Sequence, residues 1–284
     1  MRIAHNIASL NVYRNYSSNL EKQSKIFNRA STGQKINGAG DNPNALGKSE
    51  LMRIQIRGLQ MAQRNVQDGV SMLQSADSSL STINGYLNRI KELTIQAGGV
   101  GDDGDREVIQ NEINQMIEGI GNVVDGSEFN GVKYLKEDTT KDNNNPTLVS
   151  MLAGANSGEE INIPFFNLSP ENLKDTSGKS LKDLDISKGN IDEALSVIDA
   201  SINMIIDARG QYGALCNRLE TAFDSAGDMG LTLEKAESSI RDADMGFEIM
   251  ELSKHSLLIE AGNAMMAQTN NFPQDVLRIL ERVK

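Results

Sequence analysis

Apolar residues recur at alternating steps of three and four residues along three stretches of the chain, 66–90, 109–123 and 191–222. Such steps place side chains on one face of a helix, and their sustained alternation is typical of helices that pair as in a coiled coil. The chain is therefore predicted to be mainly α-helical. The apolar positions are Val66, Val70, Leu73, Ala76, Leu80, Ile83, Leu87 and Ile90; Ile109, Ile113, Met116, Ile120 and Val123; and Ile191, Leu195, Ile198, Ile202, Ile205, Ala208, Tyr212, Leu215, Leu219 and Ala222.

Three segments rich in turn-forming residues are predicted to interrupt the helical pattern. GGVGDDGD, residues 98–105, is expected to end the first long helix, with Asp105 as the N-cap of the next. NGAGDNPNA, residues 37–45, predicts another break. SEFNGVKYL, residues 127–135, has Asn-Gly between short apolar runs, which predicts a β-hairpin.

Residues 138–188 differ in composition from both flanks. Three of the five prolines, Pro146, Pro164 and Pro170, lie here together with many Ser, Lys and Asp residues. INIPFFNL, residues 161–168, could form a short strand with a break at its proline. We interpret this segment as a small exposed insert between two helical halves.

The two ends of the chain also carry apolar residues at helical spacing. Neither end has an evident partner, so the expectation is that the two stripes bury one another and then pack against other copies of the chain. The positions expected to form these stripes are Ile3, Ile7, Leu10, Leu20, Phe27, Met245, Ile249, Leu252, Ile259, Met266, Val276, Leu277 and Leu280.

Composition narrows the class of protein. The formal net charge of −11 disfavours binding to nucleic acid or anionic lipid. No apolar stretch approaches the roughly 20 residues that span a bilayer, and His5, Asn6 and Ser9 interrupt any signal-peptide core. A single cysteine, Cys216, excludes an internal disulfide framework. Neither membrane insertion nor a cleaved signal peptide is expected.

Motifs for catalysis or metal binding are weak. Gly47-Lys48-Ser49 ends like a phosphate-binding loop, but Asn42 stands where its first glycine is needed. His5 and His255 have no neighbouring ligand at metal-binding spacing, and Cys216 is more typical of a packed small side chain than of a nucleophile. We therefore expect no enzyme activity, no cofactor and no metal site.

Both ends resemble bacterial flagellin. The matching segments are NIASLNVYRN (6–15), RASTGQKINGAGDNPNALGKSELMRIQIRGL (29–59), RNVQDGVSMLQSADSSL (64–80) and the long run from RLETAFDSAGDMG to NNFPQDVLRIL (218–280). The resemblance implies a long antiparallel helical hairpin or coiled-coil bundle with a small β-containing insert.

The resemblance also implies a domain organisation. Residues 1–40 and 245–284 would pair as inner-tube helices, and residues 41–137 and 189–244 would form an outer-tube helical domain with the β-hairpin. Residues 138–188 would be a short, exposed, variable insert. In this family the terminal segments are disordered in free subunits and become ordered on assembly.

The implied function is that of a self-assembling subunit of the flagellar filament, used in swimming motility and exported by the flagellar type III route to the cell exterior. The implied partners are other copies of the chain, the flagellin export chaperone, the filament cap, hook-associated proteins and a host Toll-like receptor. One alternative is a hook–filament junction protein, which would form short rings. Another, an enzyme hosted in the insert, is disfavoured by the insert's short length.

The resemblance implies three kinds of further site. LNRIKELTIQ, residues 87–96, and IQNEI, residues 109–113, resemble the segments that the Toll-like receptor binds, with Leu87, Arg89 and Glu112 as contact residues. VLRIL, residues 276–280, resembles the segment that a cytosolic flagellin sensor binds, at Val276, Leu277, Ile279 and Leu280. Glycosylation is expected at hydroxyl groups of the insert, for example Thr139, Thr140, Ser150 and Ser157.

Overall fold

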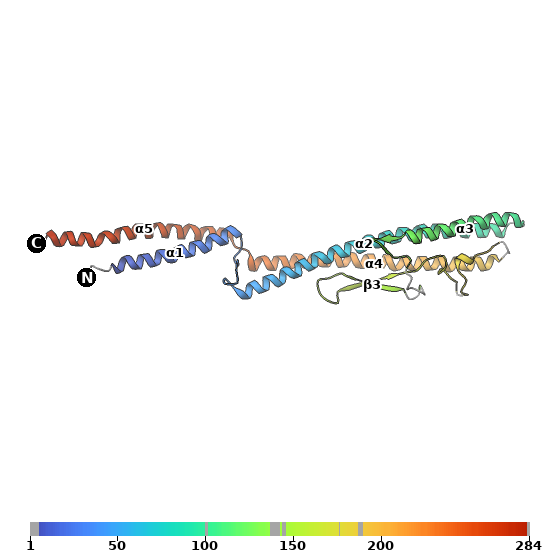
Figure 1. Ribbon diagram of the computed structural model, residues 1–284, viewed down its shortest axis with the longest axis horizontal. Coiled ribbons are helices and arrows are strands. Elements are labelled where there is room, and N and C mark those ends of the chain that lie inside the picture. The colour runs from blue at the N-terminus through green and yellow to red at the C-terminus, as the bar shows by residue number, and fades with distance from the viewer. Residues whose placement is uncertain are drawn as a thin grey trace. The chain divides into compact units, whose positions relative to one another are not determined.

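The computed structural model describes residues 6–99, 102–136, 143, 146–175, 177–186 and 190–282. These residues form helices α1 (Ile7–Thr32), α2 (Pro43–Gly98), α3 (Asp103–Gly126), α4 (Ile191–Arg241) and α5 (Met245–Arg282), a short 3₁₀ helix η1 (Leu181–Asp183), and strands β1 (Glu128–Phe129), β2 (Val132–Lys133), β3 (Thr147–Leu152) and β4 (Glu160–Phe165). Figure 1 shows these elements along the chain. The prediction of a mainly α fold with a small β component is confirmed.

The chain divides into two compact units. The terminal unit comprises residues 1–54 and 232–284, and the middle unit comprises residues 55–231. Helices α2 and α4 contribute residues to both units, because each continues through a unit boundary.

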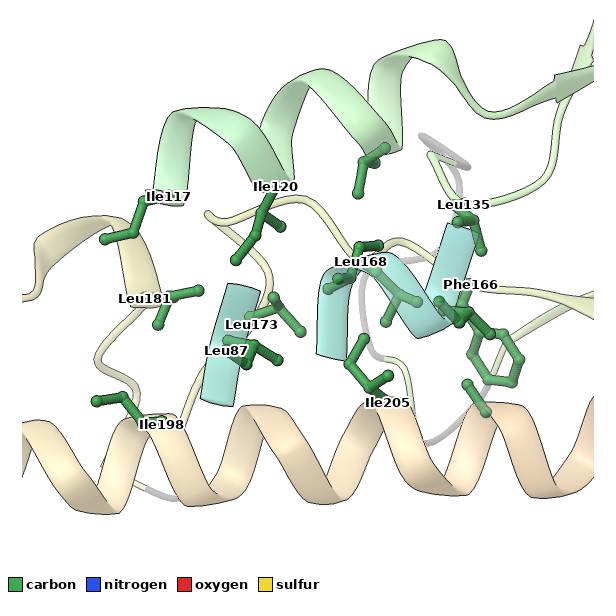
Figure 2. Close-up of a cluster of buried hydrophobic side chains, with 14 of the residues drawn as sticks. Leu87, Ile117, Ile120, Leu135, Phe166, Leu168, Leu173, Leu181, Ile198 and Ile205 are labelled. Atoms are coloured by element: carbon green, nitrogen blue, oxygen red, sulfur yellow. The ribbon is translucent and has the colours of Figure 1, made fainter. Parts of the chain in front are cut away.

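The core of the middle unit is built from the apolar stripes that periodicity predicted. Leu80, Ile83 and Leu87 of α2 are fully buried, as are Ile120 of α3 and Ile205 of α4. Figure 2 shows Leu87, Ile120 and Ile205 converging on one cluster. Three helices therefore bury one common apolar interior, which accounts for most of the stability of this unit.

The segment predicted to be an exposed insert contributes to this core, so that expectation is wrong for the part from β4 onward. Leu148, Val149 and Leu152 of β3 are exposed. Figure 2 shows Phe166, Leu168 and Leu173 among the helix side chains. The helices alone do not enclose the interior, and the apolar residues of this segment fill the remaining space. Its buried apolar residues are Ile161, Ile163, Phe165, Phe166, Leu168, Leu173, Leu181, Leu184 and Ile186.

Strand β4 continues through Pro164, so the predicted proline break is also wrong. The Ala153 N–H donates to the Glu159 carbonyl at 2.9 Å, which makes that pair a hydrogen-bonded one. Hydrogen-bonded and non-hydrogen-bonded pairs alternate along an antiparallel ladder. Counted from Ala153, the pair of Pro164 with Leu148 is a non-hydrogen-bonded one, so the missing N–H of Pro164 removes no hydrogen bond between the strands. The Pro164 carbonyl instead accepts a hydrogen bond from Tyr212 Oη at 3.0 Å.

The predicted β-hairpin is confirmed. Strands β1 and β2 pair through Phe129 and Val132, and the two turn residues, Asn130 and Gly131, have φ of 52° and 79°. Positive φ at both central positions is the condition for a type I′ turn, which Asn-Gly adopts readily.

The predicted helix breaks near residues 37–42 and 99–102 are also confirmed. The N-cap of α3 is Asp102 and not Asp105, because the Asp102 carboxylate accepts a hydrogen bond from the Gly104 N–H. Adjacent aspartates compete for this position, and spacing alone does not decide which of them caps the helix.

Candidate assembly surface

Helices α1 and α5 of the terminal unit pack side by side (Figure 1). Polar groups form much of the face between them. Asn6 Nδ2 donates to the Thr269 carbonyl at 2.8 Å, and Asn19 Oδ1 lies 3.2 Å from Nδ1 of the buried His255. Tyr16 packs over Gly262, where an added Cβ would lie 3.5 Å from its ring, in ordinary van der Waals contact. Such a face favours one register of the two helices but buries little apolar area.

A buried ion pair adds to this polar face. Glu248 in the first turn of α5 is 5% exposed, and its Oε1 lies 3.4 Å from Nε of Arg29 in the last turn of α1. Removing Arg29, whose own side chain is partly exposed, would leave the buried Glu248 carboxylate without its charged partner. Ile26 is the buried apolar residue of α1, which shows how small the hydrophobic part of the contact is.

The apolar stripe predicted on α1 does not face α5. Ile7, Leu10, Leu20 and Phe27 are all exposed, Phe27 to 63%. The expectation that the two terminal stripes bury each other is therefore wrong for α1. Helical spacing shows that these residues share a side of the helix, but the neighbouring polar side makes the contact with α5.

On α5 the residues of the predicted stripe differ in burial. Leu252, Ile259 and Met266 are half-buried, whereas Met245 and Ile249 are exposed. Further exposed apolar residues of α5 were not predicted: Phe247, Met250, Leu257, Leu258, Met265 and Phe272. These residues give the helix a second apolar side, and that pattern in the sequence could have predicted them. The predicted stripe residues Ile3, Val276, Leu277 and Leu280, and Ile279, fall outside the residues whose side chains are described.

A groove of about 930 Å³ runs along these two helices. Large apolar side chains form its walls, and small or polar side chains lie between them. Such alternation provides holes into which apolar side chains of a partner helix can fit. The lining residues are Leu20, Gln23, Ser24 and Phe27 of α1 and Leu252, Ser253, Ser256 and Leu257 of α5.

The residues expected to contact a receptor lie in the middle unit, and they differ in exposure. Arg89 Nη2 donates to Glu112 Oε1 at 3.1 Å, and both side chains are substantially exposed. Hydrogen bonds to Glu112 and then Glu92 raise the pKa of Arg89 above its ordinary value, so the guanidinium stays charged. Leu87 is 0% exposed and belongs to the core, so its assignment as a contact residue is wrong.

The remaining residues singled out in the sequence are the expected glycosylation positions and Cys216. Ser150 in β3 and Ser157 in the following turn are exposed, whereas Thr139 and Thr140 lie outside the described residues. Cys216 is partly buried against the core, and burial, the largest cause, raises the pKa of its thiol. Within the described ranges, no cluster of three or more metal-ligating side chains occurs, and no helix is long and apolar enough to span a bilayer.

The chain is similar over most of its length to known protein families and proteins. The family described as "Bacterial flagellin N-terminal helical region" matches residues 3–140, and "Bacterial flagellin C-terminal helical region" matches residues 195–280. The flagellin of Bacillus subtilis (strain 168) is 38% identical over 304 residues, covering 99% of this chain and 100% of that protein. The flagellar filament 30.7 kDa core protein of Treponema maltophilum is 34% identical over 284 residues, with the same coverage.

Among solved structures, a putative flagellar hook-associated protein from Vibrio parahaemolyticus has a TM-score of 0.59 at 14% identity, covering 71% of this chain and 100% of that one. At this identity the likeness shows a shared fold alone, so it does not favour a junction protein over a filament protein. The family matches do distinguish the two, because they cover both helical halves and the full-length relatives are flagellins. The chain belongs to the bacterial flagellin family.

Proposed function

We propose that the exposed apolar sides of α1 and α5, with the groove along them, are the surface through which copies of this chain pack together. As a flagellin, the chain is a structural subunit of the flagellar filament. One observation carries the proposal: polar groups make much of the contact between α1 and α5, and many of the large apolar side chains of these helices lie in solvent. Burying such a side chain is worth about 1.5–3 kcal/mol, so another copy that covers it stabilises the assembly.

Open-ended growth needs two different surfaces on each copy that fit one another. The α1/α5 groove offers holes, and exposed residues elsewhere on the same helices, such as Phe247, Met250 and Phe272, offer projecting side chains. A self-complementary patch related by a two-fold axis would close into a dimer. The presence of both features on one unit supports a polymer.

The proposed assembly has an inner tube of residues 1–40 and 245–284 and an outer tube of residues 41–137 and 189–244. The division of the chain into a terminal and a middle unit supports such a separation, although its boundaries lie at 54/55 and 231/232. We keep the tube assignment as a proposal and place the apolar surface of α1 and α5 in the inner tube.

Seeded elongation tests the function directly. The purified full-length chain, added to short filament fragments, is expected to grow into long filaments visible by electron microscopy. Growth should continue in proportion to the added protein, since each added copy presents a new end. Short rings of fixed size would instead identify a junction protein, and failure to grow on any seed would contradict the proposed function.

We also propose that Arg89 and Glu112 form part of a surface read by a Toll-like receptor. Their mutual hydrogen bond holds two exposed charges in a fixed geometry, which supports specific recognition. Arg89→Ala is expected to raise the protein concentration needed for half-maximal stimulation of receptor-bearing cells by about ten-fold.

The matched control for this test is Lys91→Ala. Lys91 is a comparably exposed cation on the same helix, but it pairs with Asp199 at 2.6 Å instead of with Glu112. Wild-type stimulation by the Arg89 variant, or an equal loss with the Lys91 variant, would contradict the assignment.

The remaining partners follow from the same surface. Before assembly the exposed apolar side chains of α5 need protection, which supports binding by an export chaperone. The filament cap and hook-associated proteins would contact the chain at the two ends of the polymer. We further propose type III export to the cell exterior without a cleaved signal peptide, and glycosylation at the exposed hydroxyls of Ser150 and Ser157.

A further inference from the structure

Two chain connections meet inside the terminal unit. The connection from α1 to α2 and the connection from α4 to α5 form a short antiparallel bridge. The Lys35 N–H donates to the Arg241 carbonyl at 2.6 Å, and the Ala243 N–H donates to the Gly33 carbonyl at 2.9 Å. Backbone hydrogen bonds therefore join the α1–α2 connection to the end of α4 and to the α4–α5 connection.

The side chain of Arg241, the last residue of α4, joins this bridge to the adjoining helices. Its Nε donates to Gln34 Oε1 at 3.1 Å, and its Nη1 donates to Glu50 Oε1 at 2.8 Å and to Ser49 Oγ at 3.3 Å. The hydroxyl of the fully buried Ser49 donates in turn to Glu237 Oε1 at 2.8 Å. We call these five residues the Arg241 cluster.

The chemistry of the cluster requires arginine. The planar guanidinium donates in several fixed directions at once, whereas a lysine ammonium at the same place is a single point charge on a flexible stem. The Arg241 side chain is only 13% exposed, and its hydrogen bonds to Gln34 and Ser49 are partly buried, whereas the one to Glu50 is exposed. Arg241 contacts the connection from α1 to α2 twice, because its carbonyl accepts from the Lys35 N–H and its guanidinium donates to Gln34. Gln34 in turn pairs with Asp242 of the connection from α4 to α5.

We propose that Arg241 is a positioning residue for assembly. Arg241 holds the α1–α2 connection, and through the bridge the α4–α5 connection, against the first turns of α2 and the end of α4. It thereby sets the direction in which α1 and α5 leave those turns. That direction sets the helical twist and rise of the polymer. The inference rests on the proposed assembly surface, but the cluster shares no residue with that surface, so the two roles can be separated by mutation.

Arg241→Lys tests the positioning role. The variant is expected to elongate on seeds, because the apolar sides of α1 and α5 are intact. Electron cryo-microscopy of its polymers should give a helical twist or rise different from that of the wild type. In the unpolymerised chain, amide hydrogen exchange at Lys35 and Ala243 should be about ten-fold faster, because the bridge opens more often.

Arg53→Lys is the matched control. Arg53 also contacts Glu50, at 3.3 Å, but this pair lies along the surface of α2 and does not reach either connection. Its polymers and its exchange rates should equal those of the wild type. Ser49→Ala, which removes the buried hydroxyl without changing charge, should alter twist and exchange in the same direction as Arg241→Lys.

Two outcomes with Arg241→Lys would decide against the inference. Polymers of Arg241→Lys with wild-type twist and rise would overturn it, and so would loss of polymerisation in that variant alone, since the cluster would then govern formation and not geometry. If the wild-type chain itself fails to polymerise, the proposed function fails. Exchange at Lys35 and Ala243 then judges the cluster alone, and unchanged rates would refute it.

Discussion

Replacing Phe27 and Leu257 together by aspartate is expected to raise the protein concentration needed for seeded elongation by about 100-fold or more. The two side chains line opposite walls of the groove, and Leu257 is 66% exposed. If another copy covers both, their loss removes about 3–6 kcal/mol of apolar burial, and every 1.4 kcal/mol is about ten-fold in affinity. The introduced carboxylates add a desolvation cost on the same side.

The measurement is the critical concentration of elongation on wild-type seeds. Ser18→Asp is the control, because it adds a carboxylate at another exposed position of α1 that does not line the groove. The thermal unfolding of the middle unit should be unchanged in all three chains, since neither Phe27 nor Leu257 belongs to it. Normal elongation by the double variant would show that copies meet through some other surface.

Leu87→Ala is expected to destabilise the middle unit by about 3 kcal/mol, because removing a fully buried leucine loses transfer free energy and leaves a cavity. The free energy of unfolding would be measured by urea denaturation followed by circular dichroism. Arg89→Ala, two residues away at the surface, should change the free energy of unfolding far less, because exposed ion pairs contribute little to stability. The pair of variants separates a core role from a recognition role within one short segment.

The control for cavity formation is Ile95→Ala on the same helix. Ile95 is exposed, so its truncation removes a similar volume without opening a cavity and should change stability by less than about 1 kcal/mol. A Leu87 variant as stable as the wild type would mean that the helix can turn this residue toward solvent. The assignment of Leu87 as a receptor contact would then be open again.

Periodicity was sufficient for the helices and for the core of the middle unit. Leu80, Ile113 and Ile205 are buried where their spacing predicted, because a sustained apolar stripe has one energetically favourable place, the interior. The Asn-Gly hairpin was equally predictable, since its turn depends on the two residues in it and on little else. The terminal motifs likewise sufficed for the family.

Other features depended on how segments far apart in sequence meet. The burial of Phe166 and Leu168 followed from the space left among the helices, which no local pattern encodes. The Arg241 cluster joins Gln34 and Ser49 to a residue about 190–210 positions later, so its members carry no joint signal in the chain.

The sequence by itself determined the helical elements, the stripes that form the core and the membership of the flagellin family. Only the tertiary structure decided which side of α1 meets α5, that Leu87 is buried, and that Phe27 and Leu257 stay exposed. The physical reason is that spacing places side chains on a common side of a helix, whereas burial depends on what other segments bring to that side. On α1 and α5 polar groups make much of the contact within the chain, which leaves many large apolar side chains exposed and, by our proposal, available to other copies.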